Sequence, residues 1–262
     1  MIRPGEARDF DDYVRLFKEL GTDDPTPTRA SWLAAGLPNI MVYERDGAVV
    51  GYTSMRWLQS AAHVMHLAVA PEARRTGVGR ELMAWAAAEA RRRGLREWHL
   101  NVKVGNVPAR ALYESCGMTP RYDSAFMRIA WACLASLPEE PDAVFSMVDE
   151  REDAELEQAF GLLAGRLAAG RSRGGRVIAK LRDAAGVPLG VASFDPNHPG
   201  SYPFCVARPA CARPLLEGLR PHARPGDSWL GVTAENNEAL VDALVAAGAE
   251  VRMRIVHYAG QL

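Results

Sequence analysis

The residues whose types and spacing suggest chemistry lie in the segment HLAVAPEARRTGVGRELM, residues 66–83. An apolar stretch is followed by Arg74 and Arg75 and then by Gly77 and Gly79. If a strand enters a helix here, the first backbone N–H groups of that helix lack partners and carry the positive end of its dipole. Because glycine has no Cβ, an anion can approach this backbone closely. The segment therefore predicts a seat for phosphate or pyrophosphate, with an ordinary turn as the simpler alternative.

Two common phosphate-binding motifs are absent from this segment. The sequence contains no G-x-x-x-x-G-K-S/T pattern, so it does not encode a P-loop. Gly77-x-Gly79 also lacks the third glycine of a G-x-G-x-x-G dinucleotide motif, because position 82 is Leu. The order of elements does not suggest a doubly wound nucleotide-binding fold either.

The elements that must position this turn are predicted from periodicity and from turn residues. Apolar residues at helical spacing over 6–20 predict a helix that stops at Gly21. Asp46-Gly47 between two apolar runs predicts a hairpin. Taken together, we expect helices over 6–20, near 28–35, over 77–94 and 106–117, and strands within 40–58, over 63–70 and 97–102, and near 121–130 to finish the unit.

The sequence predicts a domain boundary, after which the same kind of unit starts again. The segment SLPEEPD, residues 136–142, is rich in proline and acidic residues and reads as a linker. We expect one domain over 1–137 and a second over 138–262, the second opening with a helix near 150–168. Both halves contain an Asn-to-Gly helix segment of the same spacing, 106–117 and 237–248, which suggests that one α+β unit occurs twice.

Composition bounds the class of protein. Of the 262 residues, 48% are apolar and 24% are charged, which is typical of a globular protein. The net charge of −1 gives no reason to expect a nucleic-acid partner. The four cysteines, at 116, 133, 205 and 211, form no metal-binding pattern, and we expect reduced thiols and no metal. With neither a signal core nor a membrane span in the sequence, a cytoplasmic location is expected.

Two sequence motifs resemble those of the GNAT superfamily of N-acetyltransferases. RRTGVG, residues 74–79, matches the (Q/R)-x-x-G-x-(G/A) pyrophosphate loop of that family. NVPARALYESCGM, residues 106–118, resembles its second signature, N-x-x-A-x-x-L-Y-x-x-x-G. The resemblance implies an α+β fold of tandem GNAT-like domains, each a mixed, largely antiparallel twisted sheet flanked by helices. The second half resembles the family in layout only, and we interpret it as a degenerate GNAT-like domain.

The resemblance also implies acetyl-CoA as cosubstrate and assigns its contacts. In the family, the backbone of the strand before the loop pairs with the pantetheine arm, and Asn106 matches an asparagine that commonly contacts the coenzyme. The matching strand positions are Leu67, Ala68 and Val69. The matching loop positions are Arg74, Arg75, Thr76, Gly77, Val78, Gly79 and Arg80.

Two side chains are candidates for the proton transfers. Tyr113 matches the family tyrosine that points at the thioester sulfur, and a phenol with an ordinary pKa of about 10 can protonate a thiolate whose conjugate acid has a pKa of about 8.5. The attacking amine must lose a proton, and His63, four residues before Leu67, is the candidate base, with a water chain as the alternative. His66 has the opposite strand parity, so we expect it on the other face of the sheet.

The sequence therefore predicts an enzyme that moves an acetyl group from acetyl-CoA to a primary amine by direct attack in a ternary complex. A longer-chain acyltransferase that uses acyl-CoA or acyl-carrier protein, and a non-catalytic acyl-CoA sensor, stay open as alternatives. The expected partner is a small-molecule or peptide amine, and the chain is expected to be a monomer or a homodimer. The second half lacks the glycine loop and has Leu244 opposite Tyr113, so no second catalytic site is expected.

Overall fold

A computed structural model describes residues 1–22, 25–172 and 174–262 of the chain. The chain forms two compact units, the first made of Met1–Pro120 and Tyr258–Leu262 and the second of Arg121–His257. The last strand, β12 (Glu250–Gln261), is thus divided between the two units. No helix in the described part of the chain has the length and apolar character needed to cross a membrane.

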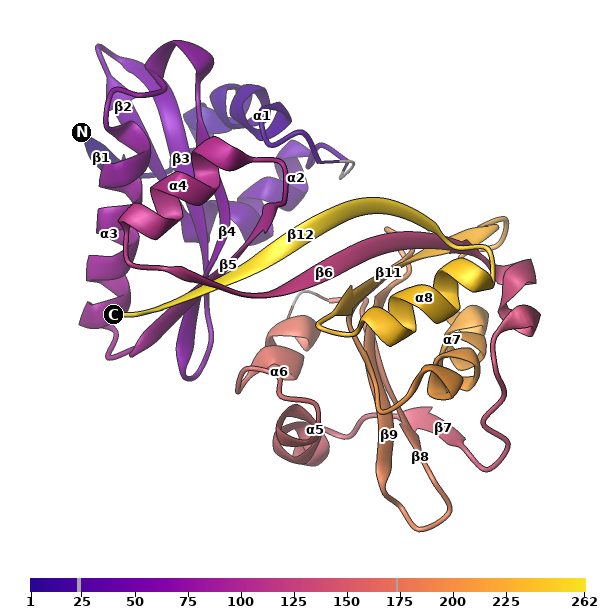
Figure 1. Ribbon diagram of the computed structural model, residues 1–262. Helices are drawn as coiled ribbons and strands as arrows, with labels where there is room; N and C mark the ends of the chain where they lie inside the picture. Colours follow the sequence, from indigo (N-terminus) through magenta and orange to yellow (C-terminus); the bar gives the residue numbers. More distant parts are fainter. Residues whose placement is uncertain (23–24, 173) are drawn as a thin grey trace. The chain divides into compact units, whose positions relative to one another are not determined.

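The first unit is built on a mixed sheet (Figure 1, indigo to magenta). Its strand order is β1-β2-β3-β4-β5, with β12 as the neighbour of β5. The pairs from β1 to β4 are antiparallel, and β4 pairs with β5 in parallel. The strands are β1 (Ile2–Pro4), β2 (Ile40–Arg45), β3 (Ala48–Trp57), β4 (Ala61–Val69) and β5 (Glu97–Lys103).

Helices cover both faces of this sheet. Neighbouring residues of β3 face opposite ways: Tyr52 packs against Tyr13 of α1, with ring centres 5.0 Å apart, whereas a Cβ on Gly51 would lie 3.0 Å from Val78 of α3. The apolar faces of the helices therefore enclose the sheet from two sides, which keeps both β3 and β4 in the core. The helices are α1 (Phe10–Lys18), α2 (Arg29–Ser31), α3 (Val78–Arg92) and α4 (Val107–Ser115).

Local sequence explains the predicted hairpin directly. Asp46 and Gly47 have φ values of 52° and 77°, and these left-handed conformations suit a tight two-residue turn between β2 and β3. The expected helix over 6–20 is shorter as an α-helix, because its first turn, Ala7–Asp9, is a 3-10 helix. The expected helix near 28–35 is present as one α-helical turn that continues as a π-helix, Trp32–Gly36.

The strands of the second unit have the order β12-β6-β11-β10-β9-β8-β7. Only β10 and β11 pair in parallel among the registers described for this unit. A Cβ on Gly190 of β9 would touch Leu215 of α7, while Gly170 of α6 lies against Ile178 of β8, so α7 and α6 cover opposite faces. The strands are β6 (Thr119–Ala130), β7 (Val144–Met147), β8 (Val177–Arg182), β9 (Pro188–Asp195), β10 (Gly200–Val206) and β11 (Trp229–Glu235), and the helices are α5 (Asp153–Ala159), α6 (Arg166–Arg171), α7 (Ala212–Leu219) and α8 (Glu238–Ala246).

Two expectations from the sequence are wrong. The helix near 150–168 is broken into α5 and α6, because Gly161 and Gly165 take positive φ values of 63° and 82° between them. The strand near 121–130 does not finish the first unit: from Arg121 it lies in the second unit, and Tyr258–Leu262 at the end of the chain complete the first. Strand exchange of this kind cannot be read from strand order along the chain, because it depends on which distant edge a strand pairs with.

The repeat between the two halves has a structural counterpart. Asn106 caps α4 by accepting a hydrogen bond from the backbone N–H of Ala109 at 3.3 Å. Asn237 caps α8 in the same way, accepting from Leu240 at 3.0 Å. In both units, the asparagine therefore starts the helix that follows the second strand of the parallel pair.

Candidate active site

The parallel strands β4 and β5 of the first unit separate partway along their length. Their register runs from Ala61↔Glu97 to Val64↔Leu100, and no pair between them follows in the described part of the chain. Both strands continue beyond this point, to Val69 and Lys103. On its other edge, β4 stays paired with β3 as far as Val69. The edge of β4 at Leu67, Ala68 and Val69 is thus left without a strand partner, and an extended ligand can pair with it as another strand would.

A tight turn connects this open strand to α3. Gly77 is the N-cap of the helix, with φ at 93°, and Arg75 also takes a positive φ, 61°. Thr76 ties the turn together by donating its hydroxyl to the carbonyl of Ala73 at 2.8 Å, and the buried Val78 anchors the first helical residue. The first N–H groups of the 15-residue helix α3 therefore point out of a well-defined turn, as the phosphate-seat prediction requires.

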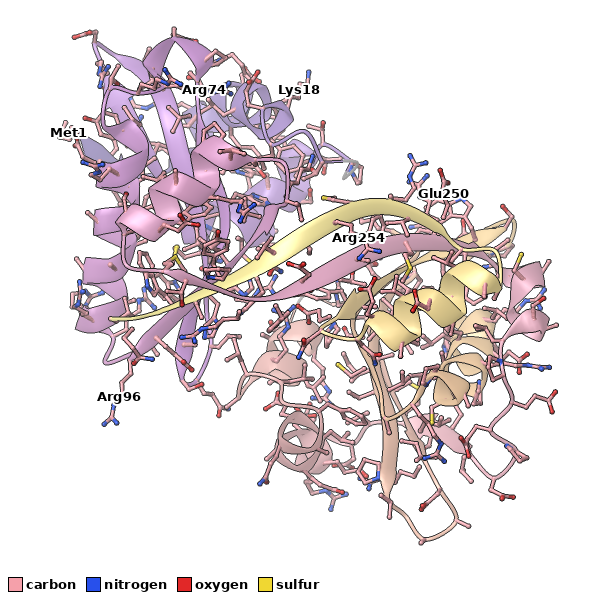
Figure 2. All side chains as sticks on the ribbon, viewed as in Figure 1. Met1, Lys18, Arg74, Arg96, Glu250 and Arg254 are labelled. Carbon is pink, nitrogen blue, oxygen red and sulfur yellow. The ribbon has the colours of Figure 1, made fainter. Side chains whose placement is uncertain are left out.

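The arginines of the turn differ in their surroundings. Arg74, labelled in Figure 2, donates to Glu19 at 2.6 Å and to the carbonyl of Val69 at 3.1 Å, so its charge is already paired. Arg75 and Arg80 are exposed and form no ion pair within the described part of the chain. Positive charge at this helix start thus comes from Arg75 and Arg80, and Arg74 fixes the turn against the end of α1.

Gly79 allows α3 to start close to two other elements. A Cβ at this position would lie 3.1 Å from Leu112 of α4 and 3.8 Å from Val69 of β4. The absence of a side chain at Gly79 therefore lets the start of α3 lie close to both β4 and α4.

Tyr113 on α4 is almost fully buried, with 7% of its surface exposed. Burial, with a smaller contribution from Cys116, raises the pKa of Tyr113 to about 12. The phenol therefore keeps its proton throughout the physiological pH range, which a proton donor requires.

Tyr258 is a neighbour of Tyr113 that the sequence analysis missed. The two rings meet edge to face with centres 6.2 Å apart. The hydroxyl of the fully buried Tyr258 donates to Glu114 at 2.8 Å and accepts from Nε of Arg110 at 3.1 Å. Tyr258 thus braces α4 on both sides of Tyr113. It follows Tyr113 by more than half the chain, and no local signal in its strand could have revealed this partner.

The expectation that His63 and His66 face opposite sides of the sheet is wrong. In the β3–β4 register, His63 pairs with Arg56 and His66 with Ser54, and a register shift at Met65 separates the two pairs. The extra residue of this β-bulge reverses the alternation, so both histidines lie on the face covered by α1. His63 is buried beside His99, its Cα partner on β5.

His66 lies among aromatic side chains, just after the point where β4 separates from β5. Its Nδ1 is 3.4 Å from the hydroxyl of Tyr52, and its ring centre is 5.5 Å from that of Phe17. Burial raises the pKa of Tyr52 well above its ordinary value, so that hydroxyl is protonated and can donate to the imidazole. The structure therefore brings a second histidine to the face on which only His63 was expected.

Known proteins resemble this chain in sequence and in fold. Residues 9–118 match the model of the acetyltransferase (GNAT) family. The chain is similar to an uncharacterized N-acetyltransferase of Archaeoglobus fulgidus, 31% identical over 131 residues, which cover 44% of this chain and 89% of that protein. It is also similar to a candidate ribosomal protein bS18 alanine N-acetyltransferase of Bacillus subtilis (strain 168), 32% identical over 80 residues. That match covers 30% of this chain and 53%, about half, of the Bacillus protein.

A solved structure resembles the whole chain. It is a tandem GNAT protein from the clavulanic acid biosynthesis pathway, which has a TM-score of 0.62 and 20% identity and matches over 100% of this chain and 98% of its own. At this identity the likeness concerns the fold, and it extends over both units. The chain belongs to the GNAT family of acetyltransferases, and its fold is that of a tandem GNAT protein.

Proposed function

We propose that the first unit transfers an acetyl group from acetyl-CoA to a primary amine by direct attack within a ternary complex. The observation that carries this proposal is the divergence of β4 from β5 beside the glycine turn of α3. An open strand edge suits the amide-containing pantetheine arm, and a helix start suits the pyrophosphate. These two features lie next to each other in one unit, in the order that the two halves of coenzyme A require.

Each part of the coenzyme has its proposed contacts. The backbone of Leu67, Ala68 and Val69 pairs with pantetheine, and the backbone N–H groups of the turn from Arg75 to Arg80 bind pyrophosphate. Asn106 uses its carbonyl oxygen to cap α4. Its exposed amide N–H groups can still donate to the coenzyme, so both roles are compatible.

Tyr113 is proposed as the acid that protonates the departing thiolate. Its position on α4, which Tyr258 braces and Gly79 brings next to β4, supports this role. A pKa near 12 lies above that of a thiol, so the developing negative charge on sulfur must drive the proton transfer. The phenol is protonated before the reaction, so it carries the proton that the thiolate needs.

The base is proposed to be a histidine of β4, either His63 or His66, acting directly or through water. Both lie on the α1 face, and neutral imidazole can accept a proton near pH 7. The variants His63→Gln and His66→Gln distinguish the two candidate bases. Only the variant that lacks the base should lose the fall of kcat/KM at low pH.

The first experiment is an amine panel in which CoA release and product mass are both measured. It should include small-molecule amines and a peptide with an N-terminal alanine, since the Bacillus relative is named for such an acceptor. Acetyl-CoA should be compared with a longer acyl-CoA and acyl-carrier protein. Binding of acetyl-CoA with no turnover of any amine would favour the sensor alternative instead.

Tyr113→Phe then tests the mechanism. General acid catalysis contributes about 10²- to 10⁴-fold, so kcat should fall about 100-fold while CoA affinity stays nearly unchanged. Tyr43→Phe is the matched control, because Tyr43 is an equally buried tyrosine on β2. Full kcat in Tyr113→Phe, when chemistry limits the rate, would mean that another group protonates the thiolate.

The second half, 138–262, is proposed to be a degenerate domain without catalysis of its own. Leu244, which takes the place of Tyr113 in the repeat, is fully buried in the apolar core of the second unit. Calorimetry of the full chain should therefore find one bound CoA. A second equivalent of CoA would show that both halves bind the coenzyme.

A further inference from the structure

The second unit has a cluster of polar side chains that the proposed acetyl transfer does not use. It lies where β10 and β11 stop pairing, after Gly200↔Gly231 and Ser201↔Val232. Tyr202 follows this point on β10 and Glu235 ends β11, and the Tyr202 hydroxyl donates to Glu235 at 2.9 Å. Arg166 of α6 and Arg176, just before β8, complete what we call the Arg166 cluster: Arg166, Arg176, Tyr202 and Glu235.

Arg166 is the group that points to a ligand. Only 8% of the residue is exposed, and its guanidinium carbon lies 4.5 Å from the centre of the Tyr202 ring. In the described part of the chain its side chain makes no hydrogen bond and no ion pair. A guanidinium has five N–H donors, and a buried charge of this kind is normally paired. Arg166 is therefore held in the cluster with its hydrogen-bonding capacity unused.

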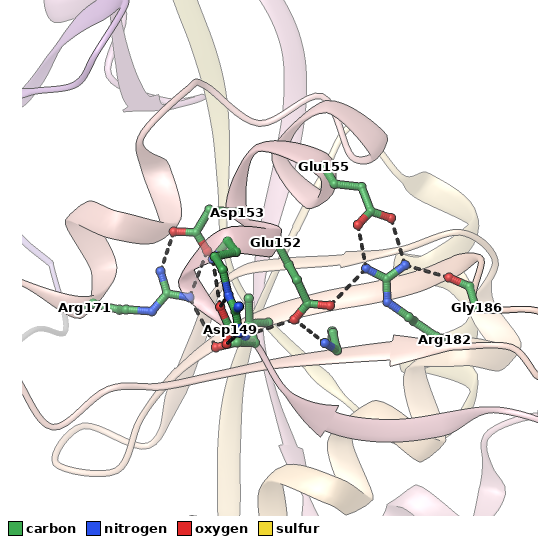
Figure 3. A network of polar contacts seen from close by, with 10 residues as sticks. Asp149, Glu152, Asp153, Glu155, Arg171, Arg182 and Gly186 are labelled. Atoms are coloured by element: carbon green, nitrogen blue, oxygen red, sulfur yellow. Dashed lines mark hydrogen bonds and ion pairs between the residues drawn. The ribbon is translucent and has the colours of Figure 1, made fainter.

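Two other arginines of the second unit show the contrast. On the same helix, Arg171 pairs with both carboxylate oxygens of Asp153, and Arg182 donates to Glu155 through two bonds of 2.8 Å (Figure 3). This network ties α5 and α6 to β8. Arg171 and Arg182 are thus paired with carboxylates although they are more exposed, whereas the buried Arg166 has no carboxylate partner in the described part of the chain.

The start of α6 is also fixed in place. Glu157, itself buried, accepts hydrogen bonds from the backbone N–H groups of Gly165 and Leu167, each at 2.8 Å. The two bonds flank Arg166 in the sequence and hold its backbone firmly. The position of its guanidinium is therefore organised by the fold before any ligand arrives.

The second arginine of the cluster, Arg176, also keeps a donor without a partner among the described residues. Arg176 lies 3.5 Å from Asp195, and its buried Nε has no hydrogen-bond partner in the described part of the chain. Burial raises the pKa of Glu235, and the nearby Arg166 and the Tyr202 hydroxyl oppose that shift. The nearby carboxyls of Asp195 and Glu235 therefore leave guanidinium N–H donors of the cluster unused.

We propose that the Arg166 cluster is a binding site for the carboxylate of a small-molecule monocarboxylate. The planar fork of Arg166 matches a carboxylate in a bidentate pair. The nearby carboxyls of Asp195 and Glu235 disfavour a phosphate dianion more than a monoanion. The Tyr202 ring beneath the guanidinium, and the stacked rings of Tyr122 and His257, 4.6 Å apart in the same unit, offer flat apolar surfaces for the body of the ligand. This site is separate from the proposed acetyl-CoA site and does not depend on it.

Calorimetric titration of the full chain with benzoate, at constant ionic strength, tests the proposal. Benzoate should bind with a stoichiometry of one, and inorganic phosphate should bind more weakly. Saturating CoA should leave the benzoate affinity unchanged, because the two sites lie in different units. Loss of benzoate binding when CoA is present would place the carboxylate in the first unit and overturn the proposal.

Two substitutions at Arg166 and one control complete the test. Arg166→Met should weaken benzoate binding about tenfold or more, and Arg166→Lys, which keeps the charge without the fork, should fall in between. Arg171→Met removes a paired arginine from the same helix and should leave the affinity within about twofold. Wild-type affinity in Arg166→Met would refute the proposal.

A measurement on the unaltered protein keeps the proposal testable if both Arg166 variants fail to fold. Crystals soaked in 4-bromobenzoate should show the anomalous signal of bromine beside Arg166. Absence of that signal at a concentration that saturates the calorimetric titration would mean that water alone solvates the guanidinium.

Discussion

Alanine at Gly77 should weaken coenzyme binding by an amount that follows from the backbone of the turn. Gly77 has φ at 93°, and no atom outside the turn comes closer to the site of a Cβ than Glu81 Oε1, at 3.8 Å. Gly77→Ala therefore introduces backbone strain without a steric clash, at about 1–2 kcal/mol for an L-residue in a left-handed conformation. In the free protein the turn can relieve this strain by leaving the left-handed region, which moves the N–H groups of Val78, Gly79 and Arg80.

Binding of CoA would have to restore the original turn. The relieved 1–2 kcal/mol is then subtracted from the binding free energy, so the Kd for CoA should rise about 5- to 30-fold. Gly94→Ala is the matched control, since Gly94 ends the same helix with φ at 76° and has nothing within 4 Å of a Cβ. In urea denaturation Gly77→Ala should lose no more stability than Gly94→Ala, and only Gly77→Ala should bind CoA more weakly in calorimetry. Equal CoA affinity in wild type and both variants would refute the pyrophosphate role of this turn.

Three further predictions concern buried polar side chains, two in the first unit and one in the second. Tyr258→Phe removes buried hydrogen bonds, one of them to the Glu114 carboxylate, and should lower the free energy of unfolding by about 1–3 kcal/mol in urea; a loss of kcat beyond that of Tyr43→Phe would show that it also positions Tyr113. Because hydrogen bonds from Arg3 lower the pKa of the buried Asp9, the carboxylate stabilises the fold above pH about 4 and this stability is lost as the pH falls further; Asp9→Asn should flatten that part of the denaturation profile. Glu157→Gln leaves one of two buried N–H groups of α6 without an acceptor and should cost about 1–3 kcal/mol, and an unchanged melting temperature would contradict this.

The sequence predicted those features whose cause is local. Asp46-Gly47 forms the predicted hairpin, and Gly77 caps α3 with a positive φ. Both turns need left-handed backbone conformations, which glycine and aspartate tolerate and which are set by residues close in sequence. Asn106 and Asn237 start their helices for a similar reason, since a short amide reaches the nearby backbone N–H groups. The broken helix near 150–168 was missed, although Gly161 and Gly165 were the available signal.

The faces on which the side chains of β4 lie were set by the pairing of β4 with β3. Alternation along the sequence puts His63 and His66 on opposite faces, but the bulge at Met65 appears only when β4 pairs with β3. One extra residue reverses the parity of every residue that follows. The candidate base therefore could not be chosen from spacing alone.

The sequence by itself determined the family, the glycine turn before α3 and the helix that carries Tyr113, because each rests on a short motif whose backbone preferences act within a few residues. Only the tertiary structure decided that Tyr258 lies against Tyr113 and that Arg166 is buried without an acceptor. Both depend on strands and helices far apart in the chain, and such contacts follow from which sheet edge or face is left to be covered. Local propensity carries no information about that choice.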